Sequence, residues 1–434
     1  MDCARGWLVF ATVILLTASW TRTEARTWHV LPDGSGDAPS IQAGITAAVA
    51  GDTVLVGCGT FYENWIDMKS GISLRSESGS AECVTIDAEQ QGPVIICLDV
   101  DPTGSIAGFT LTGGLFQNGA GLLCENSSPV IAHCRFLGNA ATTGGGLSCD
   151  QSSPTLTNCE FSDNAADAGG GLACSYSTPT ISDCTFSGNW GAVVGGGMYL
   201  WHAPLTLTDV TLTDNRSDGA GGGIYWDDSD DAGLVNVNFE HNEAMMGGGL
   251  FAEDFTYLTL VGCRFTDNEA KSAGGLGCFY EPTLTDCTFT NNSATLYGGA
   301  ALFGGSPTLT RCTLSGNSAE QGGALMCRGM SPSSLTTLTD CTLSGNVATT
   351  LGGAVYLGNS DFSAQLQAED TDFLDNVARI GTDGYLEANC TAFLRCCESE
   401  SYQWQGDGEV TIDDTDCGTI AERLSWGRAK TLYH

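Results

Sequence analysis

The sequence predicts an all-β chain that folds as a right-handed, single-stranded parallel β-helix (a solenoid) with a short N-terminal capping helix. Three observations predict this class. A unit of about 25 residues recurs along the chain, its apolar residues alternate in short pieces, and runs of glycine keep step with the unit. Repetition at such a period is typical of solenoids, in which each repeat packs only on its neighbours.

The repeat unit reads C-x-F-x-x-N, a short spacer, G-G-G-L-x-C, a turn and P-T-L-T. Its asparagine recurs at nearly even intervals, which lengthen toward the end of the repeats. We expect these asparagines to form a ladder of stacked side-chain amides at a bend, because asparagine tolerates unusual backbone angles. They are Asn139, Asn164, Asn189, Asn215, Asn242, Asn268, Asn292, Asn317, Asn346 and Asn376.

Within a unit the apolar residues have a period of two. Leu147 and Cys149 flank a serine, and Cys159 and Phe161 flank a glutamate. Such short alternating pieces are strands, and a unit built from them must coil once and stack on the next coil. The alternation predicts that Phe161 is buried, and the glycines permit a bend that a side chain would block. Ten such coils would make a rod roughly 50 Å long, and earlier coils, at residues 71–79 and 105–114, would add to it.

The chain divides into four parts. Residues 1–25 contain an apolar stretch from Trp7 to Trp20, which predicts a signal peptide, with an uncleaved anchor as the alternative. Residues 26–64 predict an N-terminal cap, and residues 65–380 predict the β-helix repeats. Residues 381–434 predict a cysteine-rich C-terminal cap with a basic tail. No segment after the signal is apolar enough to span a membrane.

The N-terminal cap has its own pattern. Ser40 is a candidate N-cap for a short helix that carries Ile41, Ile45 and Val49 on one face. A strand is expected at Thr53 to Val56. A helix at this place would cover the open first coil, as a solenoid requires.

Charge narrows the possible partners. The chain has 51 acidic and 16 basic side chains, for a formal net charge of −35. This balance excludes nucleic acid and anionic membranes as partners, because their phosphates would be repelled. It suits an extracellular surface. No resident cofactor is predicted; calcium is a possible counter-ion, and the five histidines show no metal-ligand spacing.

Most of the 20 cysteines follow the repeat, and a further group lies after residue 380. Export would place them in an oxidising compartment. Three arrangements fit: disulfides within one coil, free thiols packed as small apolar groups, and bridges between neighbouring coils. Five coils carry cysteine at both inward positions: Cys124 and Cys134, Cys149 and Cys159, Cys174 and Cys184, Cys278 and Cys287, Cys327 and Cys341.

One patch of the repeats is chemically unusual. In three successive coils an aromatic residue occupies the outward position two after the triple glycine, and aromatic or acidic residues follow it. Aromatic rings beside carboxylates suit sugar recognition, paired carboxylates serve as acid and base in glycoside hydrolysis, and close carboxylates bind calcium. A solvated acidic edge is the structural alternative. The candidate ligand-binding residues are Tyr199, Trp201, Tyr225, Asp227, Asp228, Phe251, Glu253 and Asp254, and the candidates for any catalysis are Asp227, Asp228, Glu253 and Asp254.

A second pattern is T-x-T, which recurs in one register of the repeat, as at Thr283 and Thr285 or Thr308 and Thr310. Columns of threonine on a flat face resemble ice-binding surfaces. Threonine is also a common exposed strand residue, and the columns break at residues 233–235.

Two resemblances to known families support the fold. Residues 40–64, SIQAGITAAVAGDTVLVGCGTFYEN, resemble the N-terminal cap of pectin-lyase-like right-handed β-helix proteins. The F-x-x-N and G-G-A-[LV] copies, such as those at residues 322–325 and 352–355, resemble the repeats of chlamydial polymorphic outer membrane proteins. Together they cover about residues 28 to 378. They imply the fold but no single activity, since the superfamily holds lyases, hydrolases, esterases and non-catalytic adhesins.

The chain departs from the enzymatic families of this fold. Galacturonases that resemble it carry N-T-D, a paired aspartate, G-H-G and R-I-K, and only the pair Asp227-Asp228 occurs here. The segment from Gly59 to Glu63 resembles a pectinesterase G-x-Y-x-E segment, but it also suits a plain cap strand.

These observations predict a secreted or cell-surface, non-catalytic protein that acts as an adhesin-like or structural binding surface. Its expected partner is an extracellular glycan or a surface protein. The alternative is a carbohydrate-active enzyme, a polysaccharide lyase or glycoside hydrolase, acting on an extracellular polysaccharide. The only Lys or Arg within residues 199–254 is Arg216, which disfavours an anionic substrate.

Overall fold

The computed structural model describes residues 24–229, 231–253, 256–330, 334–358, 362–399, 403–413 and 417. Apart from its last two residues, the predicted signal peptide lies outside these residues, and so does the basic tail. Within the described residues, no helix has the length and apolar character needed to cross a bilayer.

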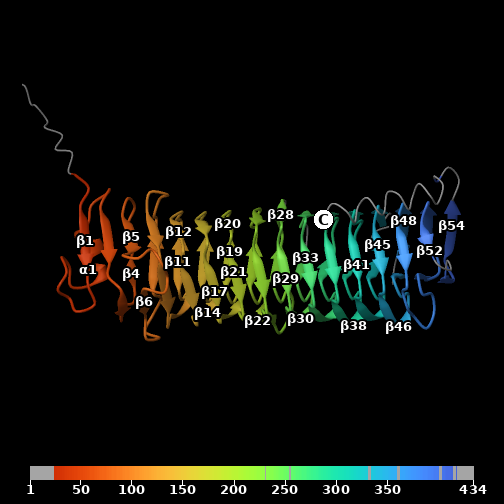
Figure 1. The fold of residues 1–434 in the computed structure, drawn as a ribbon, viewed down its shortest axis with the longest axis horizontal. Coiled ribbons are helices and arrows are strands. Elements are labelled where there is room, and N and C mark those ends of the chain that lie inside the picture. Colours follow the sequence, from red (N-terminus) through yellow and green to blue (C-terminus); the bar gives the residue numbers. More distant parts are fainter. Residues whose placement is uncertain are drawn as a thin grey trace, which may run out of the picture.

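Parallel sheets build a rod, seen from the side in Figure 1. Within the described residues, sheet A has 16 strands, from β1 (Thr27–Val30) to β54 (Glu409–Asp413). Sheet B has 14 strands, from β3 (Gly59–Phe61) to β52 (Glu398–Ser399). Neighbouring strands in each sheet come from successive coils, so the chain is the predicted right-handed parallel β-helix.

Two further sheets complete the coil. Within the described residues, sheet C has 14 strands, from β4 (Ile66–Asp67) to β53 (Trp404–Gly406), and sheet D has 10, from β10 (Leu115–Asn118) to β46 (Val347–Leu351). The rod therefore has about 14 coils. Coils at its two ends lack the repeat asparagine and add to the ten that the repeat marks, as expected at the N-terminal end and not at the C-terminal end. At one strand spacing per coil the rod is roughly 65–70 Å long.

One coil illustrates the path of the chain. It runs through β16 (Thr155–Thr157) in sheet A, β17 (Glu160–Ser162) in sheet B, β18 (Ala165–Ala168) in sheet D and β19 (Leu172–Ser175) in sheet C. The spacer of the repeat is thus itself a strand, which the sequence did not predict. In β18 only Ala166 is buried, so its apolar alternation is too weak to recognise.

Apolar columns fill the interior. Phe136, Phe161 and Phe186 are fully buried, and their rings stack with centroids 4.5 and 4.4 Å apart. The predicted burial of Phe161 is confirmed. The columns form because each strand pairs in register with the same strand of the next coil, as Phe136 does with Phe161.

The repeat asparagines lie at the bend between sheets B and D and are buried. Asn164 illustrates their bonds: its side-chain Nδ2 donates to Asn189 Oδ1 at 3.0 Å and to the Phe136 carbonyl at 2.9 Å. Its Oδ1 accepts from the backbone and the side-chain nitrogens of Asn139, both at 3.0 Å. The side chain of Asn164 is therefore fully satisfied without water, as a buried amide requires.

The N-terminal cap contains α1 (Ile41–Ala47), at the red end of the rod in Figure 1. Ser40 caps it, because its Oγ accepts the Ala43 N–H at 3.1 Å. Ile41 and Ile45 are fully buried, but Val49 is 54% exposed, so its placement on the same helix face was wrong. The helix ends at Ala47, two residues too early to orient Val49 inward.

Glu63 has a structural role in the same cap. Its carboxylate accepts the first helical N–H groups, those of Ile41 at 2.8 Å and Gln42 at 3.1 Å. A carboxylate at a helix N-terminus accepts hydrogen bonds from the first backbone N–H groups, which have no partner within the helix. The segment that resembles a pectinesterase motif thus serves as part of the cap here.

Disulfides join different coils. Cys58 pairs with Cys83 across successive coils, with Cα atoms 4.8 Å apart, and Cys396 pairs with Cys417. Fifteen further cysteines in the described residues are free and buried. Cys149 and Cys159 are among them, so the within-coil arrangement, one of the three that fit the sequence, does not occur at this pair. Cys149 instead pairs in register with the cysteines of the coils on either side, as a thiol inside an apolar column.

The coils continue past residue 380, where the repeat was expected to end. Strand β51 (Thr391–Arg395) pairs with β48 (Gln365–Glu369) on one side and with β54 on the other. The cysteine-rich segment thus contributes further coils.

Candidate functional site

The site lies at the corner where each coil passes from sheet C to sheet A. A single residue with positive φ makes this turn in successive coils: Tyr176 at 48°, His202 at 46° and Asp228 at 48°. Non-glycine residues rarely adopt this conformation. In it the three side chains occupy equivalent positions on consecutive coils, about one strand spacing apart.

A ladder of buried hydrogen bonds supports this corner from inside. Ser152 Oγ accepts the Ser127 N–H at 2.9 Å, and Ser177 Oγ accepts the Ser152 N–H at 3.0 Å. Ser229 Oγ accepts the Ala203 N–H at 2.9 Å. Each bond joins one coil to the next directly behind the outward residues. Because Ala203 has no hydroxyl, these bonds join the coil of Tyr176 to the coil before it and the coil of His202 to that of Asp228.

Aromatic rings gather outside this ladder. Tyr176 is 54% exposed, and its ring meets Trp201 edge-on with centroids 4.9 Å apart. The Tyr176 and His202 rings stack at 4.7 Å with an interplanar angle of 19°. His202 Nε2 lies 3.2 Å from Asp228 Oδ2. We call Tyr176, Trp201, His202 and Asp228 the corner cluster.

The other aromatic candidates are placed differently. Tyr199, Tyr225 and Phe251 point outward from β23 (Met198–Trp201), β27 (Ile224–Asp227) and β31 (Leu250–Glu253). Their rings stack in a column at 5.8 and 6.0 Å. Tyr225 and Phe251 are nevertheless only 9% and 2% exposed. They offer a ligand almost no surface.

The glycine bends explain this burial. Each bend folds a strand of sheet D back beside the outer face of sheet C, so that Gly247 lies close over Phe251. Farther along the rod the same arrangement forms a second apolar cluster, in which Tyr297 from sheet D packs against Leu302 and Met326 from sheet C. Alternation along a strand identifies outward side chains, but it does not show that another sheet covers them.

The carboxylates beside this column bind tyrosine hydroxyls. Tyr225 Oη donates to the Glu253 carboxylate. Burial, this hydrogen bond and the nearby charges raise the pKa of Tyr225 well above its usual value. Burial and the charge of Asp227 likewise raise the pKa of Tyr199. Both hydroxyls therefore stay protonated, and that of Tyr225 acts as a donor to a carboxylate rather than as a base.

The same pair occurs again far from the corner cluster. Tyr356 Oη donates to the Glu387 carboxylate of the next coil, and Tyr356 is 4% exposed. A tyrosine on sheet C paired with a glutamate two positions farther along on the following coil is thus a recurrent feature of the rod. This recurrence indicates that Glu253 has a structural role.

The structure thus separates the predicted patch into parts. Trp201 and Asp228 belong to the corner cluster, whereas Tyr225 and Phe251 are covered. Asp254 lies outside the described residues. Tyr176 was not predicted, although it occupies the position of His202 in the preceding coil.

Metal binding finds no support in the geometry. Among the described residues, no three His, Cys, Asp or Glu side chains are arranged to hold an ion. Calcium binding stays a prediction.

Comparison with known proteins bears on the fold. Residues 47–220 and 222–391 match the family model of the right handed beta helix region. The chain belongs to this family. No curated protein matches this β-helix. One solved structure, a mannuronic acid specific polysaccharide family 6 lyase from human gut microbiota, is similar over 93% of this chain and 90% of its own, at 10% identity and a TM-score of 0.34. A likeness of that size carries no argument about activity.

Proposed function

We propose that this β-helix is a non-catalytic, extracellular glycan-binding protein that contacts its ligand through the corner cluster. The observation that carries the proposal is the assembly of the exposed Tyr176 ring and the half-buried Trp201 and His202 rings beside the Asp228 carboxylate. It is adhesin-like in that one face of a rigid rod holds the contact residues.

The chemistry of the cluster suits a sugar. A pyranose ring has an apolar face of C–H groups and a rim of hydroxyls. Aromatic side chains such as those of Tyr176 and Trp201 pack against the apolar face. A carboxylate such as that of Asp228 accepts hydrogen bonds from the hydroxyl groups. Serine hydroxyls hold the coil of Tyr176 to the coil before it, and the coil of His202 to that of Asp228, before a ligand arrives, which lowers the cost of ordering the cluster on binding.

Several features support an extracellular place of action. The Cys58–Cys83 and Cys396–Cys417 bridges are typical of an oxidising compartment. The apolar stretch within residues 1–25 has the composition of a signal peptide. The resemblance of the repeats to those of chlamydial polymorphic outer membrane proteins also favours a cell surface.

One observation favours the enzymatic alternative. Asp227 and Glu253 pair in register on neighbouring strands, so their side chains leave the sheet about one strand spacing apart. Two carboxylates are the usual catalytic groups of glycoside hydrolysis. The bond from Tyr225 to Glu253, and its repetition at Tyr356 and Glu387, make binding the better-supported function.

A glycan array tests the proposal. We expect the parent chain to bind at least one glycan, and the double variant Tyr176→Ala, Trp201→Ala to bind it at least about tenfold more weakly, since aromatic anchors dominate such contacts. The control is Tyr62→Ala, which removes an exposed tyrosine, 66% accessible, from the N-terminal cap.

Two results would count against binding at the corner cluster. The first is undiminished binding by the double variant. The second is depolymerisation of the bound glycan by the parent chain, with loss of that activity in Asp227→Asn, Glu253→Gln; this result would establish the enzyme instead.

A further inference from the structure

Sheet A widens toward the C-terminal end of the rod. Earlier strands such as β36 (Thr283–Thr285) and β40 (Thr308–Thr310) have three residues. The last four strands have five residues each: β44 (Leu335–Thr339), β48, β51 and β54. The first two of these longer strands explain two long repeat intervals in the sequence. Strand β44 lies between Asn317 and Asn346, and β48 lies between Asn346 and Asn376.

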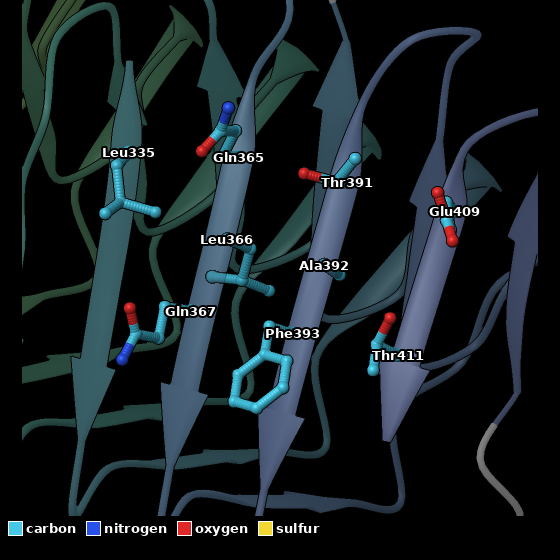
Figure 2. Close-up of a pocket in the computed structure, with 9 residues that line it drawn as sticks. All are labelled: Leu335, Gln365, Leu366, Gln367, Thr391, Ala392, Phe393, Glu409 and Thr411. Atoms are coloured by element: carbon cyan, nitrogen blue, oxygen red, sulfur yellow. The ribbon is translucent and has the colours of Figure 1, made fainter. Parts of the chain in front are cut away.

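The widened face contains a shallow hollow of about 390 Å³, shown in Figure 2. Two rows of side chains line it. Gln365, Thr391 and Glu409 pair in register in one row, and Gln367, Phe393 and Thr411 pair in register in the other. Figure 2 shows the two rows side by side on the same face of neighbouring strands.

The second row differs from the rest of its column. In most earlier coils the position of Gln367 is occupied by threonine, as at Thr308 and Thr337, with Val130 and Gly233 among the exceptions. At the hollow the column changes to an amide and then to the ring of Phe393, which is 38% exposed. Phe393 differs from the other exceptions in placing an exposed phenyl ring between polar side chains, and it does so on the widened part of the sheet.

We propose that this hollow is a second carbohydrate subsite, one that takes a neutral sugar ring lying on Phe393. The inference rests on the proposed function for its ligand class, but on different residues. The Gln365 and Gln367 amides each donate and accept hydrogen bonds, as do the Thr391 and Thr411 hydroxyls, so they match the hydroxyl groups of a sugar. The Phe393 ring provides the apolar surface.

The charge of the hollow selects against acidic sugars. No cation is among its lining residues, and Glu409 is at its edge. Arg395 on β51 pairs with Glu369, with 2.8 Å between Nη1 and Oε1. A uronate or sulfate group would lie beside the Glu409 carboxylate with no cation in the lining to offset it, so neutral sugars bind in preference.

The two subsites lie far apart on one rod. In sheet A, β24 (Thr206–Thr208) is the strand that follows Trp201, and β51 lies seven strands farther along. This separation places the hollow roughly 34 Å along the axis from the corner cluster. A glycan long enough to reach both subsites gains affinity from their linkage, whereas a short oligosaccharide occupies one at a time.

Titration with soluble neutral polysaccharides (mannan, galactomannan and β-glucan), with polygalacturonate as the charged counterpart, tests the inference. We expect at least one neutral polymer to bind, and Phe393→Ala and Gln367→Ala each to weaken it about tenfold or more. The control is Thr308→Ala, in the same column outside the hollow. Thermal unfolding of each variant verifies its fold.

The outcomes separate this subsite from the corner cluster. Unchanged binding by both hollow variants overturns the inference, and if Trp201→Ala still abolishes binding, the proposed function stands alone. Loss in the hollow variants with full binding by Trp201→Ala supports the hollow and contradicts the corner cluster. Tighter binding of polygalacturonate than of every neutral polymer, or no binding of any, also overturns the inference.

Discussion

At the corner between sheets A and B, Asp183 turns the chain with a φ of 53°. The described residues include 27 non-glycine residues with positive φ, of which eleven are aspartate and five asparagine. These two residue types tolerate the left-handed conformation because their short side chains bond locally. Part of the net charge of −35 is therefore a consequence of backbone geometry. From composition alone, this charge was related only to an extracellular surface and not to the turns of the backbone.

This account predicts how Asp183 tolerates replacement. Asp183→Gly and Asp183→Asn should leave the free energy of unfolding nearly unchanged, because both residues accept positive φ. Asp183→Val should lower it by about 1–2 kcal/mol, since a β-branched side chain is strained there. Urea denaturation measures the difference. Equal stability of the valine and glycine variants would contradict the account.

The same scale shows what sequence reasoning missed at the site. Alternation placed Tyr225 and Phe251 outside the coil, as they are, but it carried no information on the strand of sheet D that covers them. Tyr176 occupies the position of His202 one coil earlier. It lies outside the three coils whose aromatic and acidic residues defined the predicted patch, and so it was not predicted. A site assembled from several coils is visible only once the register of each corner is known.

At the scale of elements, prediction followed the strength of the pattern. Sheets A, B and C contain large apolar residues at every second position, and α1 begins at its predicted cap, Ser40. Sheet D was missed because its strands contribute few large apolar residues to the core. Disulfides within one coil were considered because cysteines tend to occur together in the same coil. In the structure, however, the strand register places a cysteine such as Cys149 beside residues of the neighbouring coils.

The phenylalanine column allows a direct test of this packing. Phe161→Ala should lower the free energy of unfolding by about 3–5 kcal/mol, because a fully buried ring leaves a cavity between two stacked neighbours. Phe393→Ala, at an exposed ring, should cost less than about 1 kcal/mol. Chemical denaturation of both variants provides the comparison. A loss for Phe161→Ala as small as that expected for Phe393→Ala would contradict the observed register.

At the scale of the whole molecule, the repeat predicted one continuous solenoid but missed the coils after residue 380. The ends deviate because a cap must differ from the coils it covers: α1 and Glu63 replace the repeat at one end, and the Cys396–Cys417 bridge occurs near the other. The rod presents equivalent positions of successive coils side by side. That arrangement makes a surface such as the corner cluster from residues that lie a full repeat apart in the sequence.

Hydrogen exchange of the chain with and without its glycan tests the central proposal most directly. The account predicts slowed exchange at the corner that carries Tyr176, Trp201 and His202, and, for a long neutral glycan, at β48 and β51 as well. The interior strands of sheet B should be unchanged, because they lie away from both subsites. Protection confined to other faces of the rod, or no protection by any glycan, would contradict the account.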